Sequence, residues 1–337
     1  PRDWSSDVCS SDLAFDRFID VRDYTDAAIA KLLRQSEIDI AVDLKGYTQD
    51  ARPGILAHRP APVQASYLGF PGTMGADYID YFIADGVVAP TEHARWYGEK
   101  LVHLPDSYQC NDSKREIAAR TPLRGEAGLP EAGFVFCSFN NSYKIAPEIF
   151  AVWMRLLKSV EGSVLWLLDD NAAAVRNLRR EAESSGVAGT RLVFAPRANL
   201  DYHLARHRLA DVFLDTLPCG AHTTASDALW AGLPVVTCLG TTFAGRVAAS
   251  LLHAVNMPEL ITETLADYES LALALAREPE WLASFKAKLD ANRRTAPLFD
   301  TVRFTRNLET VYRRMWERAQ DGLPPASFAV DARGSLA

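Results

Sequence analysis

The feature that most constrains the fold is a regular alternation of apolar and amphipathic segments between residues 134 and 255. Apolar runs such as FVFCSFN, SVLWLLDD and PVVTCLG are separated by helical patterns such as PEIFAVWMRLLKSV and TTFAGRVAASLLHAV. Five strand–helix alternations over about 120 residues predict a parallel, doubly wound α/β sheet. Because such sheets bind ligands at the carboxyl ends of their strands, a site is expected in the loops that follow these strands.

The rest of the chain divides around this region. Apolar runs such as PVQASYLG and YIDYFIADGVVAP predict a second, partial α/β domain before it, and a polar stretch from Asn111 predicts the boundary. The opening PRDWSSDVCSSDL has no clear period and is interpreted as a non-native segment. The expected divisions are 1–13 (non-native segment), 14–125 (partial N-terminal domain), 126–295 (C-terminal domain), 296–322 (C-terminal helix) and 323–337 (frayed tail).

Charge and cysteine content argue against several classes of protein. The 36 Lys and Arg residues are outnumbered by 43 Asp and Glu residues, and the resulting net charge of −7 argues against a nucleic-acid-binding groove. No apolar run is long enough to predict a membrane span, and no signal peptide is recognised. The five cysteines form no CxxC pair, so we expect reduced thiols in a cytoplasmic protein.

The sharpest local pattern is DTLPCGAHTTASDALWAG, in which a strand ends, a short loop follows and His222, Thr223 and Thr224 open a helix. The first N–H groups of a helix have no partner within it and carry partial positive charge, so they form a phosphate site. Asp227, one turn into the helix, could accept hydrogen bonds from ribose hydroxyls. A simple N-cap by Thr223 or Thr224, with Asp227 near the positive end of the helix, is the alternative interpretation.

A second pattern, SFNNSYKI, places Lys144 four residues beyond the end of a strand. A lone lysine in this position is usually solvated. Here the predicted topology brings Lys144 to the same sheet edge as the His222–Thr224 loop. A lysine at that edge could neutralise a departing diphosphate.

Two further features allow a structural or a functional interpretation. His203 and His207 share one helix face, but no third ligand is evident, so no metal site is expected. His203 lies near a strand end where a base could stack on it. The loop from Gly69 to Thr73, which includes Pro71, permits close backbone approach, or is a structural turn.

Several blocks together resemble one family. DLKGYTQDARPGILAHRPAPVQASYLGFPGTMG, FNNSYKI, FAPRANLDYHLARHRLADVFLDTLPCGAHTTASDALWAGLPVVT and PLFDTVRFTRNLETVYRRMWE are similar to the catalytic region of O-linked N-acetylglucosamine transferases. This family includes the plant SPINDLY proteins and bacterial members fused to tetratricopeptide repeats. The similarity spans about residues 14–322. It implies a GT-B glycosyltransferase fold, in which two Rossmann-like domains face a cleft and residues 126–295 hold the nucleotide sugar.

The resemblance also implies an activity: inverting, metal-independent transfer of N-acetylglucosamine from UDP-GlcNAc to Ser or Thr hydroxyls of an acceptor protein, with no cofactor. It implies that Lys144 and His222 are catalytic. The positions that it assigns to the donor, sugar or acceptor are Asn141, Ala198, His203, Thr223, Thr224, Asp227, Gly69 and Pro71. Asn141 stands where relatives often have Gln, and Leu200 replaces a lysine that contacts the ribose in animal enzymes.

The resemblance leaves alternatives open. Relatives carry a histidine-containing segment and repeats before this region, so the chain is expected to be an N-terminally truncated part of a longer enzyme. The same fold could serve a GDP-fucose O-fucosyltransferase, an Asn glucosyltransferase, a UDP-GlcNAc epimerase or an inactive nucleotide-binding scaffold. Asp80 and Asp85 are candidates for a catalytic base by residue type alone.

Overall fold

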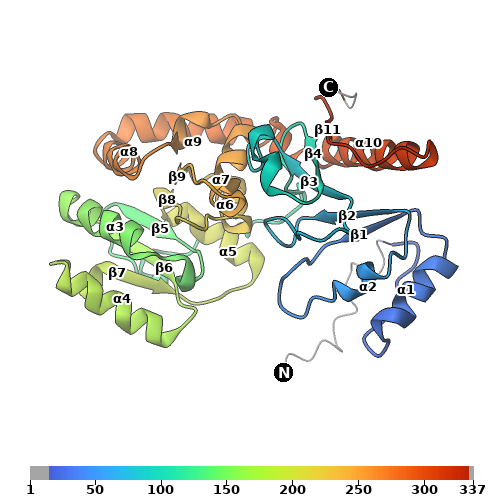
Figure 1. The fold of residues 1–337 in the computed structure, drawn as a ribbon. Helices are drawn as coiled ribbons and strands as arrows, with labels where there is room; N and C mark the ends of the chain where they lie inside the picture. The colour runs from blue at the N-terminus through green and yellow to red at the C-terminus, as the bar shows by residue number, and fades with distance from the viewer. Residues whose placement is uncertain (1–14, 334–337) are drawn as a thin grey trace.

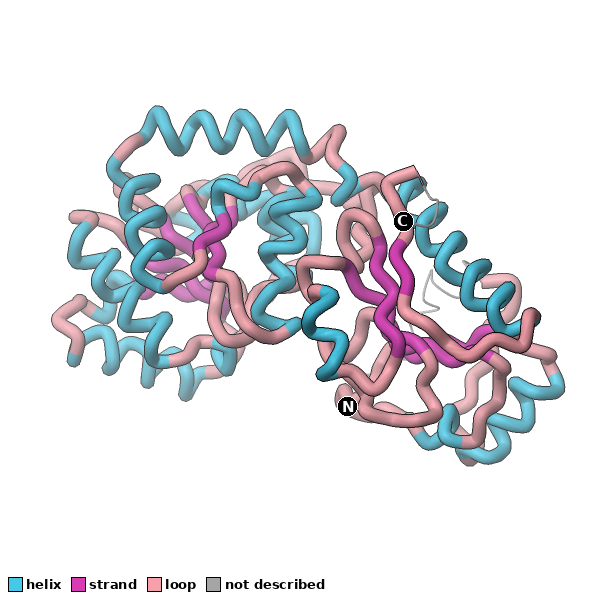
Figure 2. The backbone as a smooth tube through the Cα atoms, turned by 45° about the horizontal axis from the view of Figure 1, so that its top comes forward, coloured by secondary structure: helices cyan, strands magenta, loops and turns pink. Residues whose placement is uncertain are grey.

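A computed structural model describes residues 15–333 of the chain. The segment 1–13, interpreted from the sequence as non-native, lies outside the described residues. Two parallel sheets form the centres of two domains, and helices cover them (Figures 1 and 2). The α/β class predicted from the sequence is therefore confirmed.

The first domain contains a five-stranded parallel sheet. Its strands in spatial order are β1 (Ile40–Asp43), β2 (Val63–Tyr67), β3 (Tyr81–Asp85), β4 (Lys100–Leu104) and β11 (Phe328–Ala329). Helices α1 (Asp26–Gln35) and α2 (Gly54–Ala57) pack on each other, and α10 (Thr301–Gln320) contacts β2 and β4. The chain thus returns to its first domain after completing the second (Figure 1).

The segment 323–337, expected to be a frayed tail, contains β11 in the structure. Phe328 and Ala329 pair in parallel with Val102 and His103, and Val330 is buried. The apolar triplet from Phe328 to Val330 is too short to stand out in the sequence. It becomes a strand only because the edge of β4 is available to it.

The second domain contains a six-stranded parallel sheet and most of the helices. Its strands in spatial order are β10 (Ile261–Thr262), β9 (Val235–Cys238), β8 (Val212–Leu214), β5 (Val135–Ser138), β6 (Val164–Leu168) and β7 (Leu192–Ala195). Its helices are α3 (Pro147–Ser159), α4 (Ala172–Ser184), α5 (Leu200–Arg206), α6 (Thr223–Trp230), α7 (Phe243–Ala254), α8 (Leu265–Arg277) and α9 (Pro279–Asn292).

The strand order of the second sheet indicates where a ligand crevice is expected. The chain runs from β5 through β6 to β7 on one side, and from β8 through β9 to β10 on the other. The order reverses between β5 and β8, and the loops that leave these two neighbouring strands diverge there. Such a switch point is where open α/β sheets bind ligands. Lys144 follows β5 and His222 follows β8, so the topology brings both to this crevice.

Local sequence signals set most helix ends. Pro147 lies in the first turn of α3, and Asn171 caps α4 by accepting hydrogen bonds from the N–H groups of Ala173 and Ala174. Gly186, with φ of 76°, follows the end of α4. Short 3₁₀ turns complete the connections: η2 (Thr91–Trp96), η3 (Gly125–Ala127), η4 (Ser142–Lys144), η5 (Gly189–Arg191), η6 (His207–Leu209), η7 (Pro258–Leu260) and η8 (Pro297–Phe299).

Two crossover segments join the domains, one between β4 and β5 and one between α9 and α10. Asn111 Nδ2 of the first segment donates to Leu298 O of the second at 3.3 Å, and Arg303 Nε at the start of α10 pairs with Asp106 Oδ2 of the first at 2.7 Å. The ring of Phe243 at the start of α7 lies 4.8 Å from that of Tyr108. One continuous core cluster includes residues of both sheets, so the domains are packed against each other.

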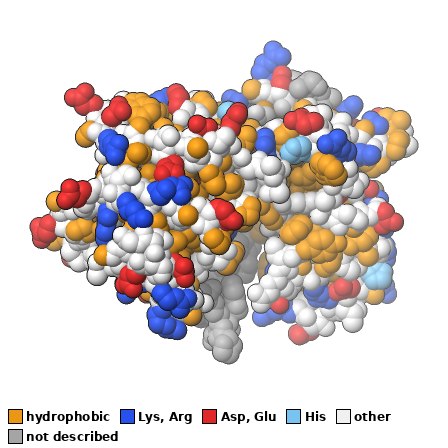
Figure 3. Space-filling view, turned by 60° about the vertical axis from the view of Figure 1, so that its left-hand side comes forward, with side chains coloured by type: hydrophobic (Ala, Val, Ile, Leu, Met, Phe, Trp, Pro, Cys, Tyr) orange, Lys and Arg blue, Asp and Glu red, His pale blue; other side chains and the backbone are white. Residues whose placement is uncertain are grey.

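On the face shown in Figure 3, acidic and basic side chains are interspersed over both domains. None of the helices in residues 15–333 is both long and apolar enough to cross a membrane.

Candidate active site

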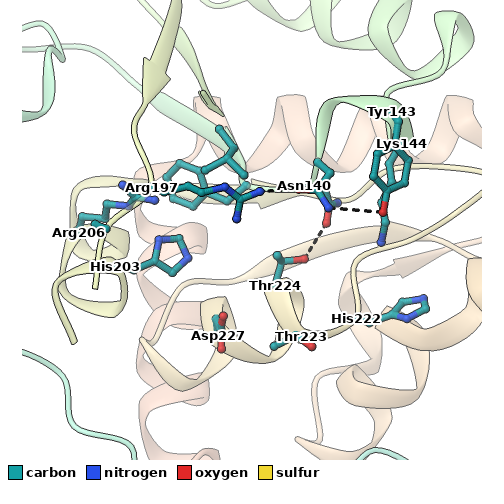
Figure 4. A pocket seen from close by; sticks show the side chains of 14 residues that line it. Asn140, Tyr143, Lys144, Arg197, His203, Arg206, His222, Thr223, Thr224 and Asp227 are labelled. Atoms are coloured by element: carbon teal, nitrogen blue, oxygen red, sulfur yellow. Dashed lines mark hydrogen bonds between the residues drawn. The ribbon is translucent and has the colours of Figure 1, made fainter. Parts of the chain in front are cut away.

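A cavity of about 440 Å³ lies at the carboxyl edge of the second sheet. Eight of the ten predicted site residues line it: Asn141, Lys144, Ala198, His203, His222, Thr223, Thr224 and Asp227. Figure 4 shows Lys144 and Asn140 on one side of the start of α6, with His203, Arg206 and Arg197 toward the other end of the cavity. The sequence pattern did not single out Phe139, Asn140, Tyr143, Leu168, Arg197 and Arg206, which also line the cavity.

Lys144 ends the 3₁₀ turn η4 that follows β5. Asp170, two residues after the neighbouring strand β6, orients this turn by accepting a hydrogen bond from Ser142 N at 2.8 Å. The Lys144 ammonium donates to Gly220 O at 2.7 Å, directly before the helix that His222 opens. A positive charge is therefore held at the junction of the two loops.

The Asn140 side chain also connects these two loops. Its Nδ2 donates to Thr216 Oγ1 at 2.9 Å, and its Oδ1 accepts from Thr224 Oγ1 at 2.6 Å. The side chain is buried, so these hydrogen bonds replace those that water would supply. A polar residue at the last position of an apolar strand run is the signal that could have identified Asn140.

Buried Asp215 shapes the loop between β8 and α6. Its Oδ1 accepts hydrogen bonds from Thr216 N at 2.7 Å and Ala221 N at 2.6 Å, and its Oδ2 accepts from Thr237 Oγ1 at 2.7 Å. The peptide bond between Leu217 and Pro218 in this loop is cis. Burial raises the pKa of Asp215 to about 6, while these hydrogen bonds act in the opposite direction.

The helix α6 presents its N-terminus to the cavity. Within residues 15–333, no group accepts a hydrogen bond from the backbone N–H of Thr223 or Thr224. His222 Nε2 lies 3.1 Å from Ala244 O. Since a carbonyl can only accept, Nε2 carries the proton. Burial, with a contribution from the Lys144 charge, lowers the pKa of His222 to about 4, so this imidazole is neutral at pH 7.

The far end of the cavity is aromatic and holds a buried cation. The His203 ring lies 5.3 Å from the Phe139 ring, and the Arg206 guanidinium lies 4.7 Å from the centre of Phe139. Arg206 Nη1 donates to Pro196 O at 2.7 Å, whereas Nε has no partner among the described residues. Burial lowers the pKa of His203 to about 2 and that of Arg206 to about 10. At pH 7 this end therefore offers a neutral ring and a charged donor.

Asp227 lies one turn into α6 and lines the cavity. In the structure, Arg115 from the first crossover forms an ion pair with Asp227, a partner that the sequence did not predict. Burial raises the pKa of Asp227, and the Arg115 charge acts against this rise.

Gly69 and Pro71 lie across the crevice in the loop after β2. Gly69 lines a second cavity of about 310 Å³, together with His222 and Thr223, which line both cavities. A Cβ at position 69 would lie 2.1 Å from Leu44 O, so only glycine fits. Pro71 is not among the residues that line either cavity.

The two acidic residues considered for a catalytic base make structural hydrogen bonds instead, within the first domain and, for Asp85, also to Ser250 of α7. Asp80 Oδ1 pairs with Arg59 at 2.9 Å, and its Oδ2 accepts from Gln64 N at 2.8 Å. Asp85 is buried and accepts hydrogen bonds from Val87 N, Val88 N, Tyr108 N and Ser250 Oγ. Both oxygens of each carboxylate accept hydrogen bonds, and neither residue is among those that line the two cavities, so the structure gives no support for either as the base.

His203 and His207 stack on each other with ring centres 4.7 Å apart. His207 Nδ1 lies 2.7 Å from His203 O, and the ring is completely buried. In residues 15–333, no cluster of three or more His, Cys, Asp and Glu residues could hold a metal ion. His207 is therefore a packing residue behind His203.

Comparison with known families and proteins assigns the chain to a family. The model of glycosyl transferase family 41 matches residues 10–120 and 116–308. The chain belongs to this family. A relative in Arabidopsis thaliana, named a probable UDP-N-acetylglucosamine–peptide N-acetylglucosaminyltransferase SEC, is 43% identical over 321 residues, which are 94% of this chain and 33% of the relative. A Petunia hybrida relative with the same activity in its name, SPINDLY, is 34% identical over 91% of this chain and 33% of its own length.

Solved structures agree with this assignment. An O-GlcNAc transferase mutant from Thermobaculum terrenum superposes with a TM-score of 0.86 and 34% identity, over 93% of this chain and 59% of that chain. Anabaena HepE, solved with UDP and glucose, matches the fold with a TM-score of 0.60 at 13% identity, over 89% of this chain and 84% of that chain. The fold of this family 41 chain is GT-B, and the chain spans about a third of the length of its curated relatives.

Proposed function

We propose that this chain is the catalytic region of an inverting glycosyltransferase that moves N-acetylglucosamine from UDP-GlcNAc to Ser or Thr hydroxyls of proteins, without a metal. The observation that carries the proposal is the meeting of Lys144 and the free N-terminus of α6 in one cavity. A site with a fixed cation and unpaired N–H groups suits a diphosphate leaving group. The names of the family 41 relatives support UDP-GlcNAc as the donor.

The donor would lie along the cavity. Its diphosphate would bind between Lys144 and the backbone N–H groups of Thr223 and Thr224. Its base would lie at the end formed by His203, Ala198 and Arg206. Asn141, whose Oδ1 accepts from Arg197 at 3.3 Å, lies between these two ends.

The second cavity would take the sugar and the acceptor hydroxyl. It adjoins His222 and Thr223 and is bounded by Gly69 of the first domain. The acceptor oxygen would attack the anomeric carbon from the face opposite the nucleotide and lose its proton to water, and the bond from that carbon to the diphosphate would break. Lys144 and the α6 dipole would stabilise the negative charge that grows on UDP. Neutral His222, with its proton on Nε2, keeps Nδ1 as an acceptor.

The described cysteines are all free thiols, which is the usual state in a reducing cytoplasm. We propose a cytoplasmic reaction on this basis. The acceptor is proposed to be a protein, because the curated relatives are named as peptide-modifying enzymes.

Lys144→Ala tests the proposal by turnover. We expect UDP release from UDP-GlcNAc, in the presence of a Ser/Thr acceptor peptide, to fall by about 100- to 1,000-fold, because an electrostatic stabiliser of the leaving group is lost. The matched control is Lys158→Ala, on the exposed face of α3, which should not change the rate. Equal turnover of the Lys144→Ala and unchanged proteins would contradict the role. Conversion of UDP-GlcNAc without any acceptor would instead indicate an epimerase.

A further inference from the structure

Arg115, in the first crossover between the domains, contacts the helix α6. The Trp230 Nε1 of α6 donates to Arg115 O at 3.1 Å, and the Arg115 guanidinium lies 5.9 Å from the centre of the Trp230 ring. Arg115 Nη2 lies 3.4 Å from Ser226 Oγ, and Nη1 pairs with Asp227 Oδ1. The Arg115 side chain is only 12% exposed, so these contacts fix both its backbone and its guanidinium.

Arg115 also lies in the wall between the two cavities. It lines the second cavity, while its partner Asp227 lines the donor cavity. The ion pair uses Asp227 Oδ1, and no described residue donates a hydrogen bond to Oδ2. The Asp227 side chain is 8% exposed. A nearly buried carboxylate thus has one oxygen held by the crossover and one oxygen available to a ligand.

We propose that Arg115 is a positioning residue of the donor site, which holds Asp227 ionised and turned so that Oδ2 accepts hydrogen bonds from the ribose hydroxyls. This inference rests on the proposed nucleotide-sugar site. Arg115 acts on the ribose through Asp227, with which it forms the ion pair. The first crossover therefore fixes the orientation of Asp227, although it is not one of the two loops that follow β5 and β8 at the switch point.

The physical reason is the cost of burial. A carboxylate removed from water favours its protonated form, and a protonated oxygen is a poorer acceptor for a hydroxyl. The planar guanidinium offsets this cost and fixes the direction of the carboxylate plane. Without Arg115, Asp227 could rotate or take up a proton, and either change would weaken its bond to ribose while leaving the diphosphate and base contacts in place.

Three variants of the full chain separate the roles. Arg115→Met removes the charge and keeps most of the apolar stem beside Trp230. Arg115→Lys keeps a charge without the planar fork. The matched control is Arg120→Met, in the same crossover, whose side chain is 68% exposed and pairs with Glu126 at 2.6 Å. Thermal unfolding of each variant checks that the fold is retained.

The readout is the preference for UDP over 2′,3′-dideoxy-UDP, measured by calorimetric titration. We expect the unchanged protein and Arg120→Met to bind UDP at least about tenfold more tightly than the dideoxy compound, because hydrogen bonds to a charged group are lost. In Arg115→Met the preference should fall to within about threefold, with unchanged affinity for dideoxy-UDP. Arg115→Lys should restore part of the preference.

Two outcomes would overturn the inference while leaving the proposed function intact. An unchanged preference in Arg115→Met would show that Asp227 binds ribose without Arg115. An equal loss of affinity for both nucleotides in a folded Arg115→Met protein would show that Arg115 only supports the shape of the cavity. If the unchanged protein binds neither nucleotide, the proposed function fails first, and the role of Arg115 fails with it.

Discussion

At the residue scale, the site depends on buried polar groups whose partners come from distant parts of the chain. Asn140 connects the end of β5 to the start of α6. Asp215 holds the loop between β8 and α6 by accepting hydrogen bonds from two backbone N–H groups. Lys144 binds the carbonyl of Gly220 in the same loop. The position of the proposed diphosphate site is therefore set by these three side chains together.

Asp215→Ala should destabilise the protein, because Thr216 N and Ala221 N would be left buried without acceptors. We expect a loss of about 1–3 kcal/mol in the free energy of unfolding, measured in urea. Asp215→Asn should recover most of this loss, since its single carbonyl can replace Oδ1 and its amide can donate to Thr237 Oγ1. Equal stability of the Ala and Asn variants would contradict the anchoring role.

At the element scale, the alternation in the second domain was predictable, because each strand and helix there has its own apolar period and end signal. Strands β5 to β9 and helices α3 to α7 follow the predicted segments, and Pro147 and Gly186 lie at the expected helix ends. β11 was not predictable, since three apolar residues become a strand only beside β4. The sequence likewise placed Lys144 and the Thr223–Thr224 turn at one edge, which follows from strand order alone.

Contacts between residues that are distant in the chain could not be predicted from the sequence, for a different reason. Arg115 meets Asp227, and Arg206 meets Phe139, through tertiary packing that no local period encodes. Asp80 and Asp85 have the residue type of a catalytic base, yet both make structural hydrogen bonds and neither is among the residues that line the two cavities. Residue type therefore proposes a candidate, and the contacts of the folded chain decide whether it is free to act.

At the scale of the whole molecule, burial of histidines should make stability depend on pH. Burial lowers the pKa of His207 and His222 to about 4 and that of His203 to about 2, below the value near 6.5 of an unfolded histidine. Below pH 6.5 the unfolded chain takes up protons that the folded chain does not, so stability is present above this pH and is lost on acidification. Asp215, whose pKa is raised to about 6, acts in the opposite direction.

Each buried histidine should contribute a loss of up to about 1.4 kcal/mol per pH unit between pH 6.5 and its folded value. We expect the urea unfolding free energy to fall as the pH is lowered from 7 to 5. His207→Asn should flatten this dependence, because the Asn amide can donate to His203 O without titrating. His253→Asn, at an exposed position of α7, is the control. A pH profile of His207→Asn identical to that of the unchanged chain would contradict the burial argument.

The carboxyl edge of the second sheet is proposed to be a UDP site built around Lys144. Calorimetric titration of the full chain with UDP and GDP, beside the Lys144→Ala protein, tests it most directly. We expect UDP to bind at least about tenfold more tightly than GDP, and its affinity to fall by about tenfold or more in Lys144→Ala. Tighter binding of GDP would favour a fucosyl donor. Binding of neither nucleotide by the folded chain would contradict the claim and leave a scaffold without a donor site.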